Sequence, residues 1–334
     1  MLINPEISIL LPVYNAETTV KRAVSSLLAQ SFGNFELIVV DDGSSDQTRK
    51  LLGSFHDSRV KVYPTPHRRL VAALNYGLTK IKAPIIARMD ADDHASPERL
   101  AIQLEKLTTS PELDVVASRV QYCGSILNNY GYFFYVQSQN KIMSYSDIYL
   151  NQFAESPFAH PSVMFRKRLI DRYGPYLEGN FPEDYELWLR WLSEGVKMEK
   201  LPDLLVDWYD DESRLSRTGS RYSREGFYRI KAFYFSLWYQ KLPVPRRRIW
   251  VWGAGKTVRR RSAWLTCYKL PIEGFIDIKQ SGCSTYTTCF FQEFHFSADV
   301  LILVYVSDRK GKKEIHNYLT DKGKKEGLDF WMMA

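Results

Sequence analysis

Short apolar runs alternate with helical patterns over the first 120 residues, and this alternation constrains the fold more than any other feature of the chain. The apolar runs are short enough for buried strands, and they cover residues 7–13, 35–40, 60–63, 85–89 and 115–117. Between them, apolar side chains recur at helical spacing, as in Val20, Ala23, Val24 and Leu27. Ser96-Pro97 has the composition of an N-cap followed by a first helical residue. Strands of this kind predict an α/β fold, with a mostly parallel sheet covered by helices on both faces.

Polar clusters follow three of these predicted strands. They are Tyr14-Asn15, Asp41-Asp42 and Asp90-Ala91-Asp92-Asp93. Ligands of open α/β sheets bind beyond the carboxyl ends of the strands. We therefore expect the three clusters to share one rim of the sheet.

The length and the charge distribution predict two domains. The chain has 334 residues, which at about 150 residues per domain favours two. Residues 1–240 carry a net charge of −1, whereas residues 241–334 carry 17 basic and 9 acidic residues, a net of +8. A stretch rich in Pro and Arg, residues 242–248, separates them. We expect domains at 1–240 and 246–334, the second with its own partner or surface.

Several protein classes are excluded by the same composition. The longest clean apolar run, residues 300–306, is far shorter than the ~20 residues of a membrane span. The N-terminus lacks the pattern of a signal peptide, and the four Cys form no C-x-x-C pair. The basic residues of the last quarter are scattered without an aromatic stacking motif, so we expect no nucleic-acid partner. These features predict a cytoplasmic protein.

The last 90 residues predict a small Rossmann-like α/β domain. A strand at 249–252 runs into Gly253-Ala254-Gly255, and Asp277 ends the next strand. The third glycine of the dinucleotide-binding fingerprint is replaced by Val258. Two interpretations follow: a bifunctional or NAD-sensing protein built on Gly253 and Gly255, or an ancillary domain that keeps the topology without the chemistry. The incomplete fingerprint favours the second.

The acidic cluster at 90–93 is the sharpest chemical signal. Residues i and i+2 of an extended segment point the same way, so Asp90 and Asp92 can face one pocket. Paired carboxylates suit Mg²⁺ or Mn²⁺ together with phosphate oxygens. The alternative is a solvated acidic turn in which Asp93 caps the next helix. The tetrapeptide alone does not decide between the two.

Two further acidic pairs have both structural and functional interpretations. Asp41 and Asp42 suit either a loop before a helix or hydrogen bonding to a base or ribose. Glu183-Asp184 precedes a helical stripe that includes Leu187 and Trp188. Acidic residues stabilise a helix N-terminus, but a carboxylate placed there can also act as a general base.

Taken in order, five segments of the chain resemble the family 2 glycosyltransferases over about residues 5 to 220. The segments are SILLPVYN from Ser8, LIVVDDGSSD from Leu37, DADD from Asp90, HPSVMFR from His160 and EDYELWLR from Glu183. That resemblance implies an inverting glycosyltransferase of the Rossmann-like GT-A fold with a DXD motif. It implies a nucleotide-sugar donor, UDP-linked, and a saccharide or lipid-linked saccharide acceptor. The implied pathway is bacterial surface polysaccharide or glycolipid synthesis.

The resemblance also implies roles for individual residues. Pro12, Tyr14 and Glu17 would line the base pocket, and Asp41 would hold the base. Asp90 would bind ribose or diphosphate and share the Mg²⁺ or Mn²⁺ ion with Asp92. Asp184 would be the catalytic base, with Glu183 orienting the acceptor. The segment 213–218 resembles the family's mobile loop, in which Arg217 would cover the diphosphate.

Two positions depart from the family pattern or extend it. Where the family often has Asn-x-Gly, this chain has His67-Arg68-Arg69, so Arg68 or Arg69 becomes a candidate contact for the base or phosphate. His160 is a candidate for the acceptor site. The basic last quarter, with Phe233, Phe235 or Trp238, predicts peripheral contact with the inner face of the membrane. The alternative is that these aromatic side chains pack inside the protein.

Overall fold

The computed structural model describes residues 4–211, 214, 217, 219–243, 246–279 and 287–334. Two compact units divide the chain. Unit 1 comprises Met1–Ile148, Pro157–Gly179 and Glu183–Thr218, and unit 2 comprises Tyr149–Ser156, Asn180–Pro182 and Gly219–Ala334. The main part of unit 2 thus begins before the predicted linker, and the unit takes in two short earlier segments. The division into domains at 1–240 and 246–334 stays a prediction.

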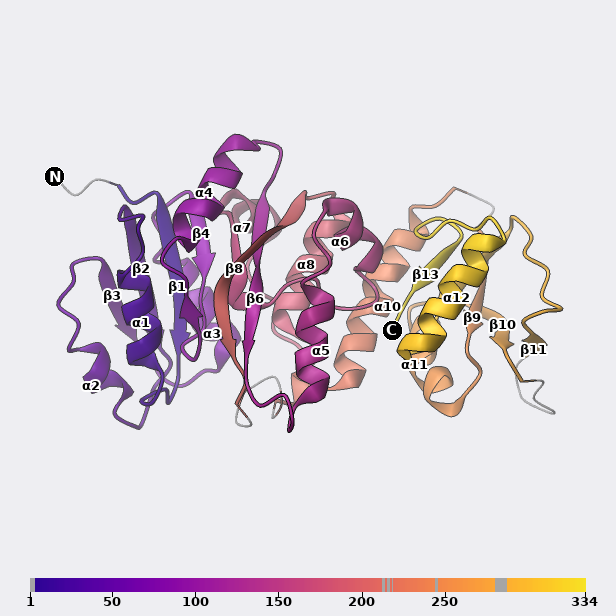
Figure 1. The fold of residues 1–334 in the computed structure, drawn as a ribbon, viewed down its shortest axis with the longest axis horizontal. Helices are drawn as coiled ribbons and strands as arrows, with labels where there is room; N and C mark the ends of the chain where they lie inside the picture. Colours follow the sequence, from indigo (N-terminus) through magenta and orange to yellow (C-terminus); the bar gives the residue numbers. More distant parts are fainter. Residues whose placement is uncertain (1–3, 212–213, 215–216, 218, 244–245, 280–286) are drawn as a thin grey trace. The chain divides into compact units, whose positions relative to one another are not determined.

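Unit 1 is built on an eight-stranded, mostly parallel sheet in the order β3-β2-β1-β4-β7-β6-β8-β5 (Figure 1). Parallel pairing joins β1 to β2 and β4, β2 to β3, and β6 to β8, while β7 is antiparallel to both of its neighbours and β5 to β8. The bounds are β1 Ile7–Val13, β2 Phe35–Asp41, β3 Val60–Pro64, β4 Ile85–Arg88, β5 His94–Ala95, β6 Val115–Cys123, β7 Val163–Arg166 and β8 Met198–Tyr209. The predicted α/β class is confirmed.

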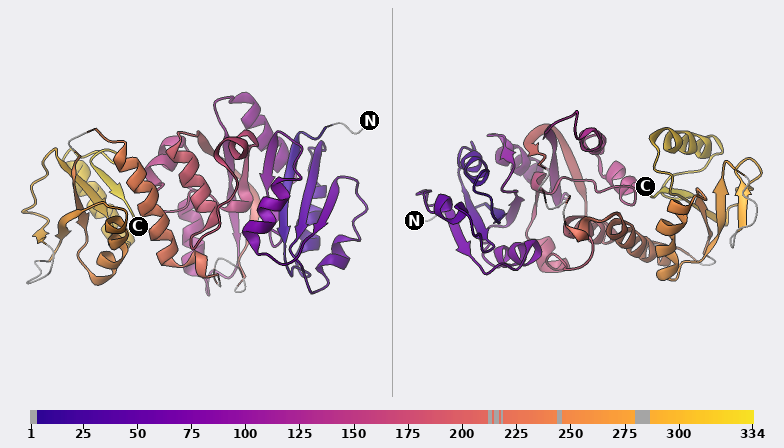
Figure 2. Two further views of the ribbon diagram at one scale, coloured as in Figure 1. Left: turned by 180° about the vertical axis from the view of Figure 1, so that it is seen from behind. Right: turned by 90° about the horizontal axis from the view of Figure 1, so that it is seen from below.

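Helices cover both faces of this sheet, as the alternation predicts (Figure 2). Along β1, Ile9 and Leu11 face a core shared with α1 and α4, whereas Leu10 faces a core shared with α3 and α8. Alternate side chains of one strand therefore serve two separate cores. The helices of this unit include α1 Val20–Leu28, α2 Thr48–Leu52, α3 Leu70–Leu78, α4 Arg99–Thr109, α7 Arg168–Tyr173 and α8 Glu183–Ser193.

The predicted start of α4 is wrong by two residues. The helix begins at Arg99, and Ser96 contributes its backbone carbonyl, not a capping hydroxyl. Gln30, which follows α1, supplies the missing acceptor: its Oε1 accepts from Leu100 N at 3.0 Å, and its Nε2 donates to Ser96 O at 2.7 Å. A side chain distant in sequence replaces the local cap, which the sequence pattern alone does not reveal.

The aromatic stretch after β6, which the sequence left unassigned, forms α5 Tyr130–Gln139 and α6 Tyr145–Asn151. On α5, Val136 belongs to a core cluster with Tyr122 of β6 and Trp208 of β8. Residues 120–140 include no charged residue, and most side chains of α5 are aromatic or amide groups. Among the described helices, none combines the length and apolar composition that a membrane span requires.

Unit 2 contains the second parallel sheet, in the order β11-β10-β9-β12-β13. Its strands are β9 Arg248–Trp252, β10 Ile272–Asp277, β11 Thr287–Phe290, β12 Val300–Val304 and β13 Phe330–Met332, with helices α10 Arg224–Gln240, α11 Lys256–Cys267 and α12 Arg309–Asp321. The predicted small Rossmann-like α/β fold is confirmed. Val258 occupies the position of the third glycine of the fingerprint. Its side chain packs against the glycine turn, since a Cβ on Gly253 would lie 3.1 Å from Val258 Cγ2.

The glycine turn of unit 2 uses its own carboxylate. Asp277 Oδ2 accepts from Ala254 N at 2.6 Å, and Asp277 Oδ1 accepts from Lys279 N at 3.2 Å. An acidic residue that binds the ribose of a dinucleotide needs those oxygens for the ligand. This arrangement gives the NAD-sensing alternative no support.

The aromatic side chains of α10 pack within unit 2. Phe235 is fully buried, with its ring centroid 5.3 Å from that of Phe153. Trp238 donates from Nε1 to Tyr149 Oη at 3.1 Å and lies 5.0 Å from the Trp331 ring. The expectation that Phe235 reaches a membrane is therefore wrong, because its burial in this core leaves no surface to insert.

A buried polar network ties the N-terminal strands together. Glu36 on β2 accepts from Ser8 Oγ at 2.6 Å and from Lys82 N at 2.9 Å, and it pairs with Lys61 of β3. Burial alone would raise the pKa of Glu36. The hydrogen bonds from Lys61, Ser8 and Lys82 together outweigh this effect, so the pKa lies below the ordinary value. The carboxylate links three strands and the turn before β4.

Substituting Glu36 by Ala should lower the free energy of unfolding by about 1–3 kcal/mol, because it leaves buried donors unsatisfied. Chemical denaturation followed by circular dichroism measures this. The matched control is Glu6→Ala, whose carboxylate accepts from Asn34 at an exposed position and should change stability by only about 0.5 kcal/mol. Equal effects of the two substitutions would contradict the account.

Candidate active site

The carboxyl ends of β1, β2 and β4 meet at one rim, as the sequence predicts. Val13 pairs with Asp41, and Leu10 pairs with Arg88, so the residues after Val13, Asp41 and Arg88 leave the sheet on the same side. The chain beyond β4 carries the acidic cluster. This register is what brings the separate motifs together.

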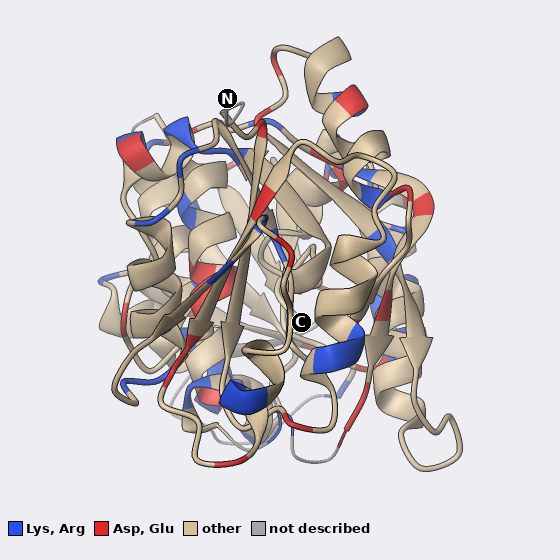
Figure 3. Ribbon diagram, turned by 90° about the vertical axis from the view of Figure 1, so that its left-hand side faces the viewer, with Lys and Arg blue, Asp and Glu red and all other residues tan. Residues whose placement is uncertain are grey.

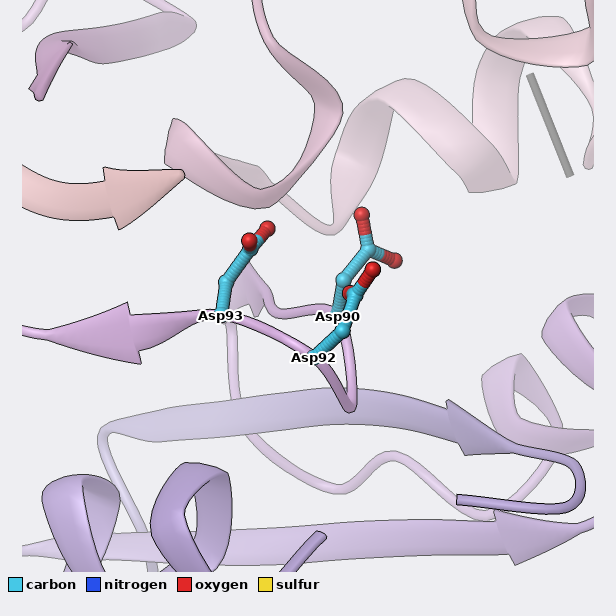
Figure 4. Close-up of side chains that lie close together, drawn as sticks. All are labelled: Asp90, Asp92 and Asp93. Carbon is cyan, nitrogen blue, oxygen red and sulfur yellow. The ribbon is translucent and has the colours of Figure 1, made fainter. Parts of the chain in front are cut away.

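Asp90, Asp92 and Asp93 form a compact group of carboxylates, which we call the acidic triad. One carboxylate oxygen from each lies within 4.8 Å of the others. All three side chains point to the same side of the ribbon (Figure 4). Asp93 is fully buried, and its Oδ1 accepts from Tyr209 N of β8 at 2.8 Å. Its Oδ2 has no hydrogen-bond partner among the described residues, so Asp93 is not a helix cap.

Two buried arginines shape the base of the triad. Arg88, the last residue of β4, donates from Nη2 to Asp90 Oδ1 at 2.5 Å and also bonds to backbone carbonyls, including that of Leu10. Arg99 of α4 donates from Nη2 to Arg88 O at 2.7 Å. Arg88 is not among the residues predicted for the site. The sequence signal for its pairing with Asp90 is a charged residue at the end of the apolar run Ile85-Ile86-Ala87.

A third arginine, Arg214, also lies against the triad. Its guanidinium is 3.5 Å from Asp92 and 3.9 Å from both Asp90 and Asp93. It also donates from Nη1 to Tyr209 O at 2.5 Å and stacks 4.1 Å above the Trp208 ring. Sequence analysis singled out Arg217 in the same segment and missed Arg214, because nothing in the local pattern separates the two.

The triad carboxyls differ in their pKa values because their surroundings differ. Burial raises the pKa of Asp90, but Arg88, His160 and Arg214 lower it below the ordinary value. Burial and the charge of Asp90 raise the pKa of Asp92, despite the opposing charge of Arg214. Burial holds the pKa of Asp93 well above its usual range. The triad is therefore an anionic site that gains from an additional cation.

Asp184 lies at the start of α8, beside Glu183. Burial, followed by the charge of Glu183, raises the pKa of Asp184 to about 8, and the charge of Asp90 adds to the shift. The two carboxyls, one after β4 and one on α8, therefore lie close enough to interact. A general base works best when its pKa lies near the working pH.

His160 is buried between these elements as a neutral side chain. Its Nε2 forms a 2.9 Å hydrogen bond with Tyr176 Oη, and its ring meets the edge of Trp188 at 5.9 Å. Burial and the charge of Arg88 lower its pKa well below the ordinary value, although Asp90 acts in the opposite direction. The geometry makes His160 a packing partner of α8 that faces the charge of Asp90.

The residues predicted to hold the base are grouped at the ends of β1 and β2. Pro12 and Asp41 are buried, and Asp41 accepts from Ser44 N at 3.0 Å and from Arg49 Nε at 3.3 Å. Glu17 accepts from Gln47 N at 2.8 Å. The exposed ring of Tyr14 stacks on His67, with centroids 4.1 Å apart. Acidic and basic residues are interspersed along the ribbon (Figure 3).

Comparison with known proteins identifies the family. The sequence profile of glycosyl transferase family 2 matches residues 8–174. The O-antigen biosynthesis glycosyltransferase WbnJ of Escherichia coli is 30% identical over 232 residues, which cover 68% of this chain and 88% of WbnJ. This chain belongs to glycosyl transferase family 2.

A further sequence relative and a solved structure extend the comparison. The UDP-Gal:alpha-D-GlcNAc-diphosphoundecaprenol beta-1,3-galactosyltransferase of Escherichia coli is 28% identical over 66% of this chain and 80% of its own length. Among solved structures, S. aureus TarS 1-349 in complex with UDP-GlcNAc matches with a TM-score of 0.56 and 18% identity, over 79% of this chain and 71% of TarS. The structural match supports the fold assignment of this glycosyltransferase.

The structure places Arg217 differently from the sequence prediction. Its Nη2 donates to Asp210 Oδ1 at 2.6 Å and to Asp210 Oδ2 at 2.5 Å. The guanidinium lies 4.3 Å above the Tyr132 ring. Nη1 donates to Asn129 Oδ1 at 3.2 Å. Arg217 is thus neutralised by Asp210, and Arg214 is the arginine at the triad. The rest of segment 213–218 lies outside the described residues.

Asp42 holds the segment that departs from the family pattern. It accepts from Arg68 N at 2.9 Å and from Arg69 N at 2.8 Å, and it pairs with His67 Nδ1 at 2.9 Å. Arg68 therefore contributes its backbone here, and its side chain is exposed. Arg69, at the place of the family glycine, has φ +71° and ψ 168°. Arg69 thus has a positive φ, which a glycine adopts without strain.

Arg69→Gly should raise the free energy of unfolding by about 1 kcal/mol, because a left-handed φ strains a residue with a Cβ. The neighbouring control, Arg68→Gly, should lower stability by about 0.5–1 kcal/mol through the greater freedom of the unfolded chain. Urea denaturation of the two variants beside the wild type measures both changes. A loss of stability in Arg69→Gly would contradict the strained conformation.

Proposed function

We propose that this family 2 glycosyltransferase transfers a sugar from a UDP-linked donor to a hydroxyl of a saccharide or lipid-linked saccharide, with inversion at the anomeric carbon. The observation that carries the proposal is the pair of acidic groups from separate elements: the triad after β4, and Asp184 on α8 with its pKa of about 8. One group suits the donor diphosphate and its cation, and the other suits an attacking hydroxyl. The relatives' names support surface polysaccharide or glycolipid synthesis.

In this mechanism Asp184 is the general base. Its carboxylate takes the proton of the acceptor hydroxyl as the oxygen attacks the anomeric carbon and the bond to the diphosphate breaks. Glu183 is the neighbour that raises its pKa and orients the acceptor. A single displacement of this kind inverts the configuration, and it needs no covalent sugar–enzyme intermediate.

The donor site lies along the rim of the sheet. Asp41, Pro12, Tyr14 and Glu17 hold the base, and Asp90 binds ribose or diphosphate. These five side chains come from the ends of β1, β2 and β4 or from the turns that follow them. Asp42 keeps the adjoining 67–69 segment in place, so that Arg68 can contact the base or phosphate.

The triad fits a divalent cation, Mg²⁺ or Mn²⁺. Its donors are hard carboxylate oxygens, the pKa of Asp92 is raised, and Asp93 Oδ2 is buried without a hydrogen-bond partner among the described residues. Asp92 and Asp90 would hold the ion. When bound, the cation neutralises charge that develops on the departing nucleoside diphosphate.

The position of α5 supports a lipid-linked acceptor. Leu127 is 96% exposed, and Ile126 and Tyr130 are also exposed, within a stretch that carries no charge. Asn129, between them, binds Arg217, which follows Arg214 in the segment that reaches the triad. Exposed aliphatic and tyrosine side chains favour the boundary between water and lipid. His160 stays a candidate on the acceptor side, through its contact with α8.

Asp184→Asn should lower kcat by about 10²–10⁴-fold and leave UDP binding nearly unchanged. In the wild type, kcat/KM should rise with pH toward a plateau above about 8, because the raised pKa keeps Asp184 protonated, and unable to accept a proton, at lower pH. Initial rates from pH 6 to 9.5 and calorimetric titration with UDP measure both effects. Near-normal turnover of Asp184→Asn would assign the base elsewhere, with Glu183 next to test.

Asp92→Ala should weaken binding of UDP in the presence of Mn²⁺ by roughly 10–100-fold or more, the range for disturbing a metal site. Excess EDTA should abolish transfer, and added Mn²⁺ or Mg²⁺ should restore it. Asp171→Ala is the matched control, because Asp171 is an exposed carboxylate whose ion-pair partner among the described residues is Lys167. Full activity in excess EDTA would contradict the metal assignment.

Peripheral membrane contact should appear as binding to anionic vesicles in co-sedimentation. Each lysine near an anionic surface contributes about 1 kcal/mol, so Lys310→Gln with Lys313→Gln, both exposed on α12, should reduce binding only at low salt. Leu127→Ser should reduce binding at low and high salt alike, because its contribution is apolar. Wild-type protein that ignores anionic vesicles at low salt would contradict the membrane proposal.

A further inference from the structure

We propose that Arg214 is a built-in counter-ion that competes with the divalent cation for Asp90, Asp92 and Asp93, so that the metal binds strongly only together with the donor diphosphate. The inference rests on the proposed function for the metal site. It adds a positioning residue that makes metal and donor binding depend on each other.

The contacts of Arg214 show that its place is built into the fold. The guanidinium lies 3.5–3.9 Å from one oxygen of each triad carboxylate, and no more than 10% of the side chain is exposed. Tyr209 O and the Trp208 ring also contact it. Because both of these partners belong to β8, this strand helps to fix the position of the arginine beside the triad.

Charge explains the consequence. Arg88 pairs with Asp90, and among the described residues Arg214 is the cation within 4 Å of all three carboxylates. A divalent cation bound by the same oxygens meets a like charge beside it, and repulsion in a buried site is stronger than in water. The cation alone therefore binds weakly.

A nucleoside diphosphate changes the balance, because it brings negative charge for both cations. The guanidinium can then pair with phosphate oxygens while the metal takes the triad. Binding of the metal and of the diphosphate is therefore cooperative, and the coupling is reciprocal. Arg217 offers a natural comparison, because Asp210 already neutralises it.

The test measures Mn²⁺ binding by calorimetry at pH 8, without nucleotide and then with saturating UDP. Arg214→Gln should tighten the Kd for Mn²⁺ alone by about tenfold, since it removes the like charge. With Mn²⁺ saturating, the same substitution should weaken UDP binding. Arg214→Lys should stay near the wild type, and Arg217→Gln should leave the Mn²⁺ affinity unchanged.

Arg214→Met gives the same test if the Gln variant does not fold, because its side chain keeps contact with the Trp208 ring. Unchanged or weaker Mn²⁺ binding in both neutral variants, with UDP coupling as in the wild type, would overturn the inference. Asp92→Ala separates this result from failure of the metal site itself. If Asp92→Ala binds Mn²⁺ as the wild type does, the triad is not the metal site, and the proposed metal role fails with the inference.

Discussion

The parallel pairing of β1 between β2 and β4 is the constraint on which the rest of unit 1 depends. Its seven residues are buried, and the two faces of the strand serve separate cores. Fixing this register places the residues after Val13, Asp41 and Arg88 on one rim. A slip by one residue would exchange the two faces of the strand and separate the motifs. The buried Glu36 network fastens the opposite ends of the same strands.

Charge compensation organises the site that this register creates. Buried carboxylates are costly unless they are paired. Arg88 donates to Asp90, and Arg99 donates to the carbonyl of Arg88, while Arg214 lies against all three carboxylates. On α8, burial and the charge of Glu183 raise the pKa of Asp184, and this raised pKa suits proton transfer. The fold thus makes one carboxylate group a place for cations and another a proton acceptor.

Local sequence patterns predict many elements of this fold, and the remaining features depend on contacts between residues far apart in the chain. Apolar runs and helical spacing predict β1 to β4 and the helices α1, α3 and α4, because each pattern is complete within its own segment. The start of α4 is different, since Gln30 supplies its acceptor from elsewhere in the chain. Likewise, Asp184 and the triad are recognisable as sequence motifs. Which arginine lies at the triad depends on a distant contact, because Arg217 pairs with Asp210 and Arg214 lies beside Asp92. Arg69 keeps a glycine conformation that no local pattern predicts, because Asp42 holds it.

The account's central claim is that the triad and Asp184 belong to one site that binds a metal ion and a nucleoside diphosphate. Diffraction from crystals grown with Mn²⁺ and UDP, with data collected at the manganese absorption edge, tests it most directly. We expect one anomalous peak bonded to a carboxylate oxygen of Asp92 and to diphosphate oxygens, with the base beside Asp41 and Tyr14. A manganese peak away from the triad, or a diphosphate bound elsewhere on the chain, would contradict the claim.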